Sequence, residues 1–193
     1  MARRGVVRGG ATQPFPAADP LTGQMEDRRA EFEKFVAENA GGLTRTAYLI
    51  VWDLHEAEDL VQETLLKVAG RWSRVRRMAR PVAYARRILV NLALAGTDRR
   101  SRRRHELAGE PVADRRADVD EPNGHDELLG ALAALPPRQR TALVLRYFLD
   151  LPEAEVAAAM KCSLGTVKST SSRGLARLER ALRTTNDTRS IPT

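Results

Sequence analysis

The sequence is poor in cysteine and contains no long hydrophobic run. One cysteine, Cys162, in 193 residues excludes an intrachain disulfide and any metal site built from clustered cysteines. No apolar segment approaches the roughly 20 residues that a membrane-spanning helix needs, and no segment has the form of a signal peptide. We therefore expect a soluble, cytoplasmic protein without membrane insertion.

Motifs for nucleotide, zinc and nucleophilic chemistry are also missing. The sequence has no G-x-x-x-x-G-K-[ST] loop, which argues against a nucleotide-driven activator. His55 is followed four residues later by Asp59 instead of a second histidine, and His105 and His125 stand alone in a polar segment. Cys162 has no base nearby in sequence and reads as a small buried residue. We therefore expect that the protein is not an enzyme and that it binds no cofactor, no metal and no small-molecule substrate.

The charge of the chain is concentrated in blocks. Residues 71–104 contain twelve arginines and one aspartate, whereas residues 26–70 contain ten acidic and five basic residues. Residues 105–127 contain eight acidic residues and two arginines, and residues 128–193 contain ten basic and five acidic residues. The chain has only four lysines. A biased base composition of the genome would explain why arginine is used in place of lysine, but it does not explain why the arginines are clustered. The two strongly basic blocks therefore indicate a polyanionic partner, interpreted as nucleic acid.

The hydrophobic pattern predicts an all-α protein of two small helical domains joined by an acidic flexible linker. Residues 1–25 are rich in Gly, Pro and Ala and are expected to be a disordered tail. Residues 26–104 and 128–183 carry apolar side chains at helical spacing, without the alternation typical of strands. Residues 105–127 lose that period and gain acidic residues, Pro and Gly, as a linker does. Residues 184–193 are expected to be a second disordered tail.

The first domain contains a two-sided helix, predicted from about His55 to Trp72, and a further helix that starts at Pro81. The apolar stripe of the two-sided helix consists of Leu60, Val61, Thr64, Leu65 and Val68. Its polar face consists of Glu58, Asp59, Gln62, Glu63 and Lys67. Taken alone, this pattern favours an ordinary solvated helix face.

The second domain ends in a candidate helix-turn-helix. Residues 152–161 and 164–183 form two predicted helices joined by a short turn, and Ser163 is placed to cap the second one. The residues predicted to point inward are Val167, Leu175, Leu178 and Leu182. The outward face is predicted to show Thr166, Lys168, Ser169, Ser172, Arg173 and Arg177. Short hydroxyl side chains allow close approach to the major groove, and basic ones reach base acceptors and phosphates.

Two sets of motifs carry a family resemblance. The second domain contains Leu135-Pro-Pro-Arg-Gln-Arg140, Val144-Leu-Arg-Tyr-Phe148, Glu153-Ala-Glu-Val156 and Gly165-Thr-Val-Lys-Ser169, and the first contains Ala57-Glu-Asp-Leu-Val-Gln-Glu-Thr64 and Tyr84-Ala-Arg-Arg-Ile-Leu-Val-Asn-Leu92. With them, residues 26–183 resemble the extracytoplasmic-function (ECF) sigma factors of the sigma-70 family, and most of all the actinobacterial sigma-E-like group. The second domain resembles sigma domain 4 and the first resembles domain 2.

The resemblance implies a role for three sets of residues. Docking on the coiled coil of the RNA polymerase β′ subunit is implied for Asp59, Leu60, Gln62 and Glu63. Reading and opening of the −10 promoter element is implied for Tyr84, Arg87, Asn91, Arg99, Arg100, Arg102 and Arg103. Reading of the −35 element is implied for Thr166, Lys168, Ser169, Ser172 and Arg173.

The chain departs from the family pattern at some positions. Tyr84 stands where the family often has Trp, and it fits a support for a flipped base and a core aromatic equally well. Residues 93–97 lack the aromatic side chains usual after the Val-Asn-Leu motif, which weakens the expected stacking on single-stranded DNA. Ser171 takes a position that is apolar in many members, so we expect looser packing of the last helix.

The sequence therefore predicts a sigma factor with core RNA polymerase (β′ and β subunits), promoter DNA and an anti-sigma factor as partners. The alternative is a stand-alone helix-turn-helix regulator, usually dimeric, that binds duplex DNA without polymerase. The motif at residues 57–64 and the basic segment at residues 71–104 argue against that alternative. An interaction protein that sequesters a partner has no positive support in the sequence.

Overall fold

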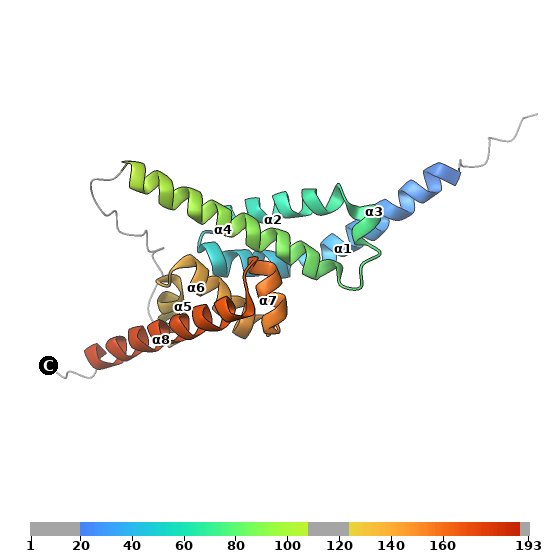
Figure 1. Ribbon diagram of the computed structural model, residues 1–193. Coiled ribbons are helices and arrows are strands. Elements are labelled where there is room, and N and C mark those ends of the chain that lie inside the picture. Colours follow the sequence, from blue (N-terminus) through green and yellow to red (C-terminus); the bar gives the residue numbers. More distant parts are fainter. Residues whose placement is uncertain (1–19, 108–123, 190–193) are drawn as a thin grey trace, which may run out of the picture.

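The computed structural model describes residues 20–107 and 124–189, with side chains described for residues 24–99 and 127–184. Within these ranges all regular structure is helical, which confirms the predicted all-α class (Figure 1). The N-terminal domain consists of α1 (Pro20–Val51), α2 (Leu54–Ala69), α3 (Trp72–Val75) and α4 (Pro81–Leu107). The C-terminal domain consists of α5 (Gly124–Ala133), α6 (Pro137–Leu143), the π-helical turn η1 (Val144–Phe148), α7 (Glu153–Met160) and α8 (Leu164–Arg189).

The N-terminal domain is held by the apolar stripe of α2, which packs against α1 and α4. Leu60, Val61, Thr64 and Val68 are buried and Leu65 is half-buried, as the spacing predicts. Asp53 starts α2 because its carboxylate accepts a hydrogen bond from the Glu56 amide at 2.8 Å. This fixed orientation turns the polar face of α2 outward.

The C-terminal domain depends on a close approach of α8 to α6. A Cβ atom placed at Gly174 would lie 3.2 Å from the Leu143 side chain, so glycine lets the two helices meet. Ser163 caps α8 as predicted, with its hydroxyl accepting from the Thr166 amide at 3.1 Å. The buried row of α8 consists of Val167, Thr170, Ser171 and Gly174.

One inward-facing residue was predicted wrongly. Leu175 is 41% exposed, whereas Val167 is buried and Leu178 and Leu182 are half-buried. The large side chain at 175 suggested an apolar contact, but the small residues Ser171 and Gly174 occupy the line that faces α6. Steric fit between helices, and not side-chain hydrophobicity alone, sets the rotation of α8.

Three segment boundaries differ from those predicted. Helix α1 begins at Pro20, inside the expected tail 1–25; Pro20 suits a first helical position. The expected linker 105–127 is shortened because α4 continues to Leu107 and α5 starts at Gly124. Helix α8 continues past residue 183 to Arg189, since each added residue gains a hydrogen bond once a helix exists. The remaining parts, residues 1–19, 108–123 and 190–193, lie outside the described residues.

The two domains pack against each other. Helix α7 lies against α4, and α6 lies against α1 and α4 (Figure 1). One continuous apolar cluster includes Ile50 and Leu89 of the N-terminal domain and Leu145 and Val156 of the C-terminal domain. Helices α4 and α7 therefore each cover part of the other's surface.

Candidate nucleic-acid and polymerase interfaces

The polar face of α2 is a candidate docking surface for a protein partner. Asp59, Gln62 and Glu63 are exposed, and Glu63 forms an i,i+4 ion pair with Lys67 at 3.1 Å. Leu60 is only 8% exposed, so its side chain packs in the core beneath this face. The surface available to a partner is thus made by the acidic and amide side chains, and Leu60 supports them from inside.

Leu66 lies on this same face but is not among the residues predicted for docking. Its side chain is 72% exposed, and it follows Gln62 and Glu63 at helical spacing, which places the three side by side. An exposed apolar side chain beside acidic and amide groups suits a partner helix that is both basic and amphipathic. The sequence does contain a signal for this residue. Leu66 directly follows Leu65, and its position lies off the apolar stripe of the helix, so an exposed leucine could have been predicted there.

The basic segment before and along α4 forms a second candidate surface. Arg87 and Arg99 are exposed, and the Arg99 Nε donates to the Ala95 carbonyl at 3.3 Å. Tyr84 is half-buried, and Arg71 donates to its hydroxyl at 3.3 Å. The backbone at 100, 102 and 103 continues α4, but the side chains of Arg100, Arg102 and Arg103 lie outside the described residues.

Among the residues predicted to read the −10 element, Asn91 forms a hydrogen bond to the other domain. Its Nδ2 donates to the Ala159 carbonyl in α7 at 3.1 Å and to the Arg87 carbonyl one turn back. The side chain is half-buried under the C-terminal domain. In this arrangement its amide hydrogens are directed to protein carbonyls.

Charged groups from both domains meet at the start of α4. Arg80 forms an ion pair with Glu155 of α7. Burial lowers the pKa of the nearby Arg86 guanidinium, against the opposing effect of Glu155 and together with that of Arg80. An arginine remains protonated despite such a shift, so Glu155 faces two positive charges across the domain boundary.

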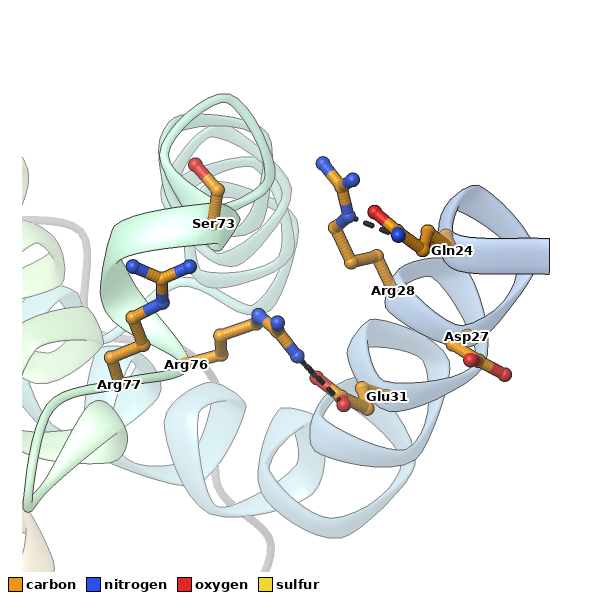
Figure 2. Close-up of a pocket in the computed structure, with 7 residues that line it drawn as sticks. All are labelled: Gln24, Asp27, Arg28, Glu31, Ser73, Arg76 and Arg77. Atoms are coloured by element: carbon orange, nitrogen blue, oxygen red, sulfur yellow. Dashed lines mark hydrogen bonds and ion pairs between the residues drawn. The ribbon is translucent and has the colours of Figure 1, made fainter. Parts of the chain in front are cut away.

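A polar groove of about 270 Å³ lies between the N-terminal part of α1 and α3 (Figure 2). Figure 2 shows Arg76 reaching across to Glu31. One guanidinium nitrogen of Arg76 lies 2.8 and 2.7 Å from the two carboxylate oxygens of Glu31. Arg28 and Arg77 also line the groove. Asp27 and Glu31 line the same groove, so acidic side chains of α1 partly balance the charge of its arginines.

The exposed face of α8 forms the third candidate surface. All five residues predicted to read duplex DNA are exposed: Thr166, Lys168, Ser169, Ser172 and Arg173. The Arg173 Nε donates to the Ser169 carbonyl at 3.1 Å, and Lys168 lies 3.7 Å from a Glu153 carboxylate oxygen. This face presents hydroxyl and basic groups along the second helix of a helix-turn-helix.

The described part of the chain contains no candidate metal centre and no candidate membrane-spanning helix. Within residues 24–99 and 127–184, whose side chains the structure describes, there is no group of three or more His, Cys, Asp or Glu side chains placed to hold a metal ion. In the same ranges, no helix has the length and apolar character required to cross a membrane. Cys162 is half-buried in the turn between α7 and α8.

These features define a two-domain helical protein with a helix-turn-helix in its second domain, and comparisons with known proteins agree. Residues 35–104 match the family model for sigma-70 region 2, and residues 125–178 match that for sigma-70 region 4. The RNA polymerase sigma-E factor of Streptomyces avermitilis is 36% identical over 154 residues, covering 79% of this chain and 85% of that protein. The ECF RNA polymerase sigma factor SigE of Mycolicibacterium smegmatis is 34% identical over 152 residues, covering 74% of this chain and 58% of that protein.

A solved structure shares the fold. The sigma factor RpoE of Bartonella quintana, crystallised with the anti-sigma factor NepR, superposes with a TM-score of 0.64 at 24% identity, over 79% of this chain and 97% of that one. The chain therefore belongs to the ECF sigma factors of the sigma-70 family. The family membership and the helical fold predicted from the motifs are confirmed.

Proposed function

We propose that this chain binds core RNA polymerase and directs promoter-specific initiation of transcription. The observation that carries the proposal is the presence of both sigma-70 regions in one chain, with the α2 and α8 faces exposed. The chain performs no covalent chemistry in this proposal, since the polymerase makes the RNA. Its place of action is then the cytoplasm, where the polymerase works.

Docking on the polymerase is assigned to the α2 face. Asp59, Gln62 and Glu63 offer carboxylate and amide acceptors to a basic helix of the β′ subunit, and Leu66 adds an apolar contact. Exposed charges chiefly set orientation and association rate, whereas the desolvated apolar group adds to the lifetime of the complex. The β subunit is expected to contact the C-terminal domain.

Recognition of the −35 element is assigned to the α8 face. Lys168 and Arg173 are long enough to reach phosphates or guanine acceptors, and Thr166, Ser169 and Ser172 leave room for the backbone to enter the major groove. Phosphate contacts set the position of the helix, and base contacts select the sequence.

Reading of the −10 element is assigned to α4 and the arginines before it. Opening a duplex requires that unpaired bases are held by stacking and that the single strand is held by charge. Tyr84 offers one aromatic face, and Arg87 and Arg99 offer charge. The Asn91 amide would have to leave the Ala159 carbonyl before it could meet a base edge. Arg100, Arg102 and Arg103 continue this basic surface by their sequence.

An anti-sigma factor is the remaining partner in the proposal. The related fold from Bartonella quintana was crystallised with such a protein. For this chain we expect it to compete with the polymerase for the α2 face, because that face carries the exposed docking groups.

The proposal is tested by DNA binding that depends on polymerase. The purified chain is mixed with core polymerase and sheared genomic DNA, and the retained fragments are sequenced. We expect a defined set of promoter fragments that requires both proteins. Specific duplex binding by the chain alone, as a dimer, would support the stand-alone regulator instead.

A further inference from the structure

The carboxylate of Glu153 lies between two cations of the C-terminal domain. One of its oxygens, Oε1, is 3.9 Å from Nη2 of Arg146, and the other, Oε2, is 3.7 Å from Nζ of Lys168. The three residues come from three elements, η1, α7 and α8, so folding of the domain brings them together. Lys168 belongs to the α8 face assigned to the −35 element, whereas Glu153 is not among the residues predicted to meet DNA.

Arg146 is the fixed end of this row of charges. Its Nη1 donates to the Leu151 carbonyl at 2.7 Å. Leu151 is buried, and its amide donates to the Leu145 carbonyl at 3.0 Å, which ties the turn before α7 to η1. Because a guanidinium carries a planar fork of donors, one arginine can hold a backbone carbonyl and face a carboxylate at the same time.

The backbone presents Glu153 in a defined place. Glu153 is the first residue of α7 and follows Pro152, whose ring fixes its φ angle, here −56°. Asp150 has a φ of 47°, in the left-handed region that aspartate is among the few residues to visit, and this conformation helps the chain to turn from η1 into α7. The Glu153 carboxylate is therefore held by the turn as well as by Arg146.

Lys168 is the flexible end of the row. Its side chain is 68% exposed, compared with 34% for Glu153 and 27% for Arg146. A lysine ammonium is a point charge on a flexible stem, so without a restraint it can turn toward many acceptors. A carboxylate at a fixed place narrows these directions. It engages one of the three ammonium hydrogens at a time, which leaves the others for an acceptor on DNA.

The docking geometry of a helix-turn-helix brings this row of charges close to DNA. The first helix crosses the DNA backbone, and the second lies in the major groove with residues near its N-terminal end at the base edges. Lys168 is the fifth residue of α8. A carboxylate beside Lys168 repels phosphates, which are charged, more than it repels base edges, which are not. Glu153 therefore directs the ammonium toward base acceptors such as O6 and N7 of guanine.

We propose that Glu153 is a positioning residue for −35 recognition, which restrains Lys168 so that its ammonium reads a base and does not bind a phosphate. This inference rests on the proposed function, which makes the −35 element the ligand of α8. Phosphate contacts are the same at every sequence, whereas base contacts carry sequence information. The restraint thus lowers the affinity for DNA of any sequence and raises the ratio of specific to non-specific binding.

Two variants separate this inference from a general effect of charge. Glu153→Gln removes the carboxylate that faces Lys168. Glu179→Gln is the matched control, since Glu179 is an exposed acid of the same domain that forms an ion pair with Arg183 of α8. Arg183 lies 15 residues beyond Lys168, or about 22 Å further along the helix at about 1.5 Å per residue. Both variants raise the net charge by one and break an ion pair of an α8 cation.

The first readout is the salt dependence of binding of the full chain, without polymerase, to a fluorescent duplex of random sequence. Affinity for such DNA comes from phosphate contacts. We expect Glu153→Gln to bind about two- to fivefold more tightly than Glu179→Gln, the size of effect that a partly exposed ion pair can supply. Its slope of log affinity against log salt should be steeper by up to about 0.9, because Lys168 gains a phosphate. Equal affinities and slopes for the two variants would overturn the proposal.

A double variant distinguishes positioning from a merely structural role. Lys168→Met keeps an unbranched side chain at this position and removes its charge. In this background Glu153→Gln should leave the salt slope unchanged, because no ammonium remains to be released. A structural role of Glu153, acting through Arg146 and the turn before α7, would persist without Lys168. The same steepening in both backgrounds would therefore contradict the proposal.

The second readout is promoter selection by the holoenzyme from sheared genomic DNA. Glu153→Gln should lower the ratio of promoter affinity to random-duplex affinity about two- to fivefold, and the retained fragments should lose their preference at one base position of the −35 element. An unchanged ratio and unchanged preferences would show that Glu153 does not direct Lys168 to a base. A wild-type holoenzyme that retains no defined fragments would instead remove the proposed function, and the salt slopes of the chain alone would still decide whether Glu153 restrains Lys168.

Discussion

The side-chain amide of Asn91 donates to the backbone carbonyl of Ala159 at 3.1 Å. This bond joins the helix assigned to the −10 element to the first helix of the helix-turn-helix. A residue implied by the family motif to meet DNA is thus engaged by the protein itself in the free chain. In this packing of the two domains, the Asn91 amide is directed to a carbonyl of α7.

Reversal of charge on the α2 face is predicted to weaken polymerase binding. Asp59→Arg should reduce the affinity for core polymerase by at least about tenfold, because a basic partner then meets a like charge. Glu38→Arg is the control, since Glu38 is an exposed acid on α1 outside this face. Affinity is measured by fluorescence anisotropy of the labelled chain, and an equal loss for both variants would contradict the assignment.

Removal of two basic side chains from α8 is predicted to affect DNA and not polymerase. Lys168→Ala combined with Arg173→Ala should weaken promoter-specific binding while leaving polymerase binding intact. The slope of log affinity against log salt should fall by about 0.9 for each side chain that contacts a phosphate. Salt titrations of promoter binding by the holoenzyme check this, and a simultaneous loss of polymerase binding would remove these residues from the DNA face.

The contact between α6 and α8 is predicted to require a small residue at 174. Gly174→Val should lower the free energy of unfolding by about 1–3 kcal/mol, because the added atoms meet Leu143. Gly130→Val is the control, since a Cβ at Gly130 has no neighbouring atom within 4 Å. Urea unfolding of both variants provides the comparison. Equal free energies of unfolding would contradict the prediction, because they would show that α8 can shift away from α6 without loss of stability.

The buried hydroxyl of Ser171 is predicted to destabilise the C-terminal domain. Ser171 is 7% exposed, and its Oγ has no hydrogen-bond partner among the described residues. Ser171→Ala should raise the free energy of unfolding by about 1 kcal/mol, more than the exposed Ser172→Ala, which gains only helix propensity. Thermal unfolding monitored by circular dichroism tests this, and a smaller gain at 171 than at 172 would argue for a bonded hydroxyl.

Much of the local structure follows from the sequence, because it depends on residues close together in the chain. The buried stripe of α2, the cap at Ser163 and the exposed face of α8 all follow from helical spacing and short-range hydrogen bonds. The exposed position of Leu175 does not follow from the sequence. It depends on how α8 is turned about its axis, which is set by the fit of Gly174 against Leu143 in α6.

The contact between the domains has no signal in the sequence pattern. Asn91 and Arg140 bond to backbone carbonyls, which every residue possesses, so no residue type marks their partners. The charge blocks indicate that the chain has both acidic and basic surfaces. They do not predict that Glu155 forms an ion pair with Arg80, because the two residues lie in different domains on either side of the linker. The three proposed binding faces also remain predictions, since their assignment comes from the family motif.

The central claim is that this chain makes core RNA polymerase specific for promoters, and run-off transcription tests it most directly. The purified chain and core polymerase are combined with a pool of genomic promoter fragments, and the transcripts are sequenced. The account predicts discrete transcripts that require both components and that disappear with Asp59→Arg. Transcripts that do not depend on the chain, or no transcripts alongside specific duplex binding by a dimer of the chain, would contradict it.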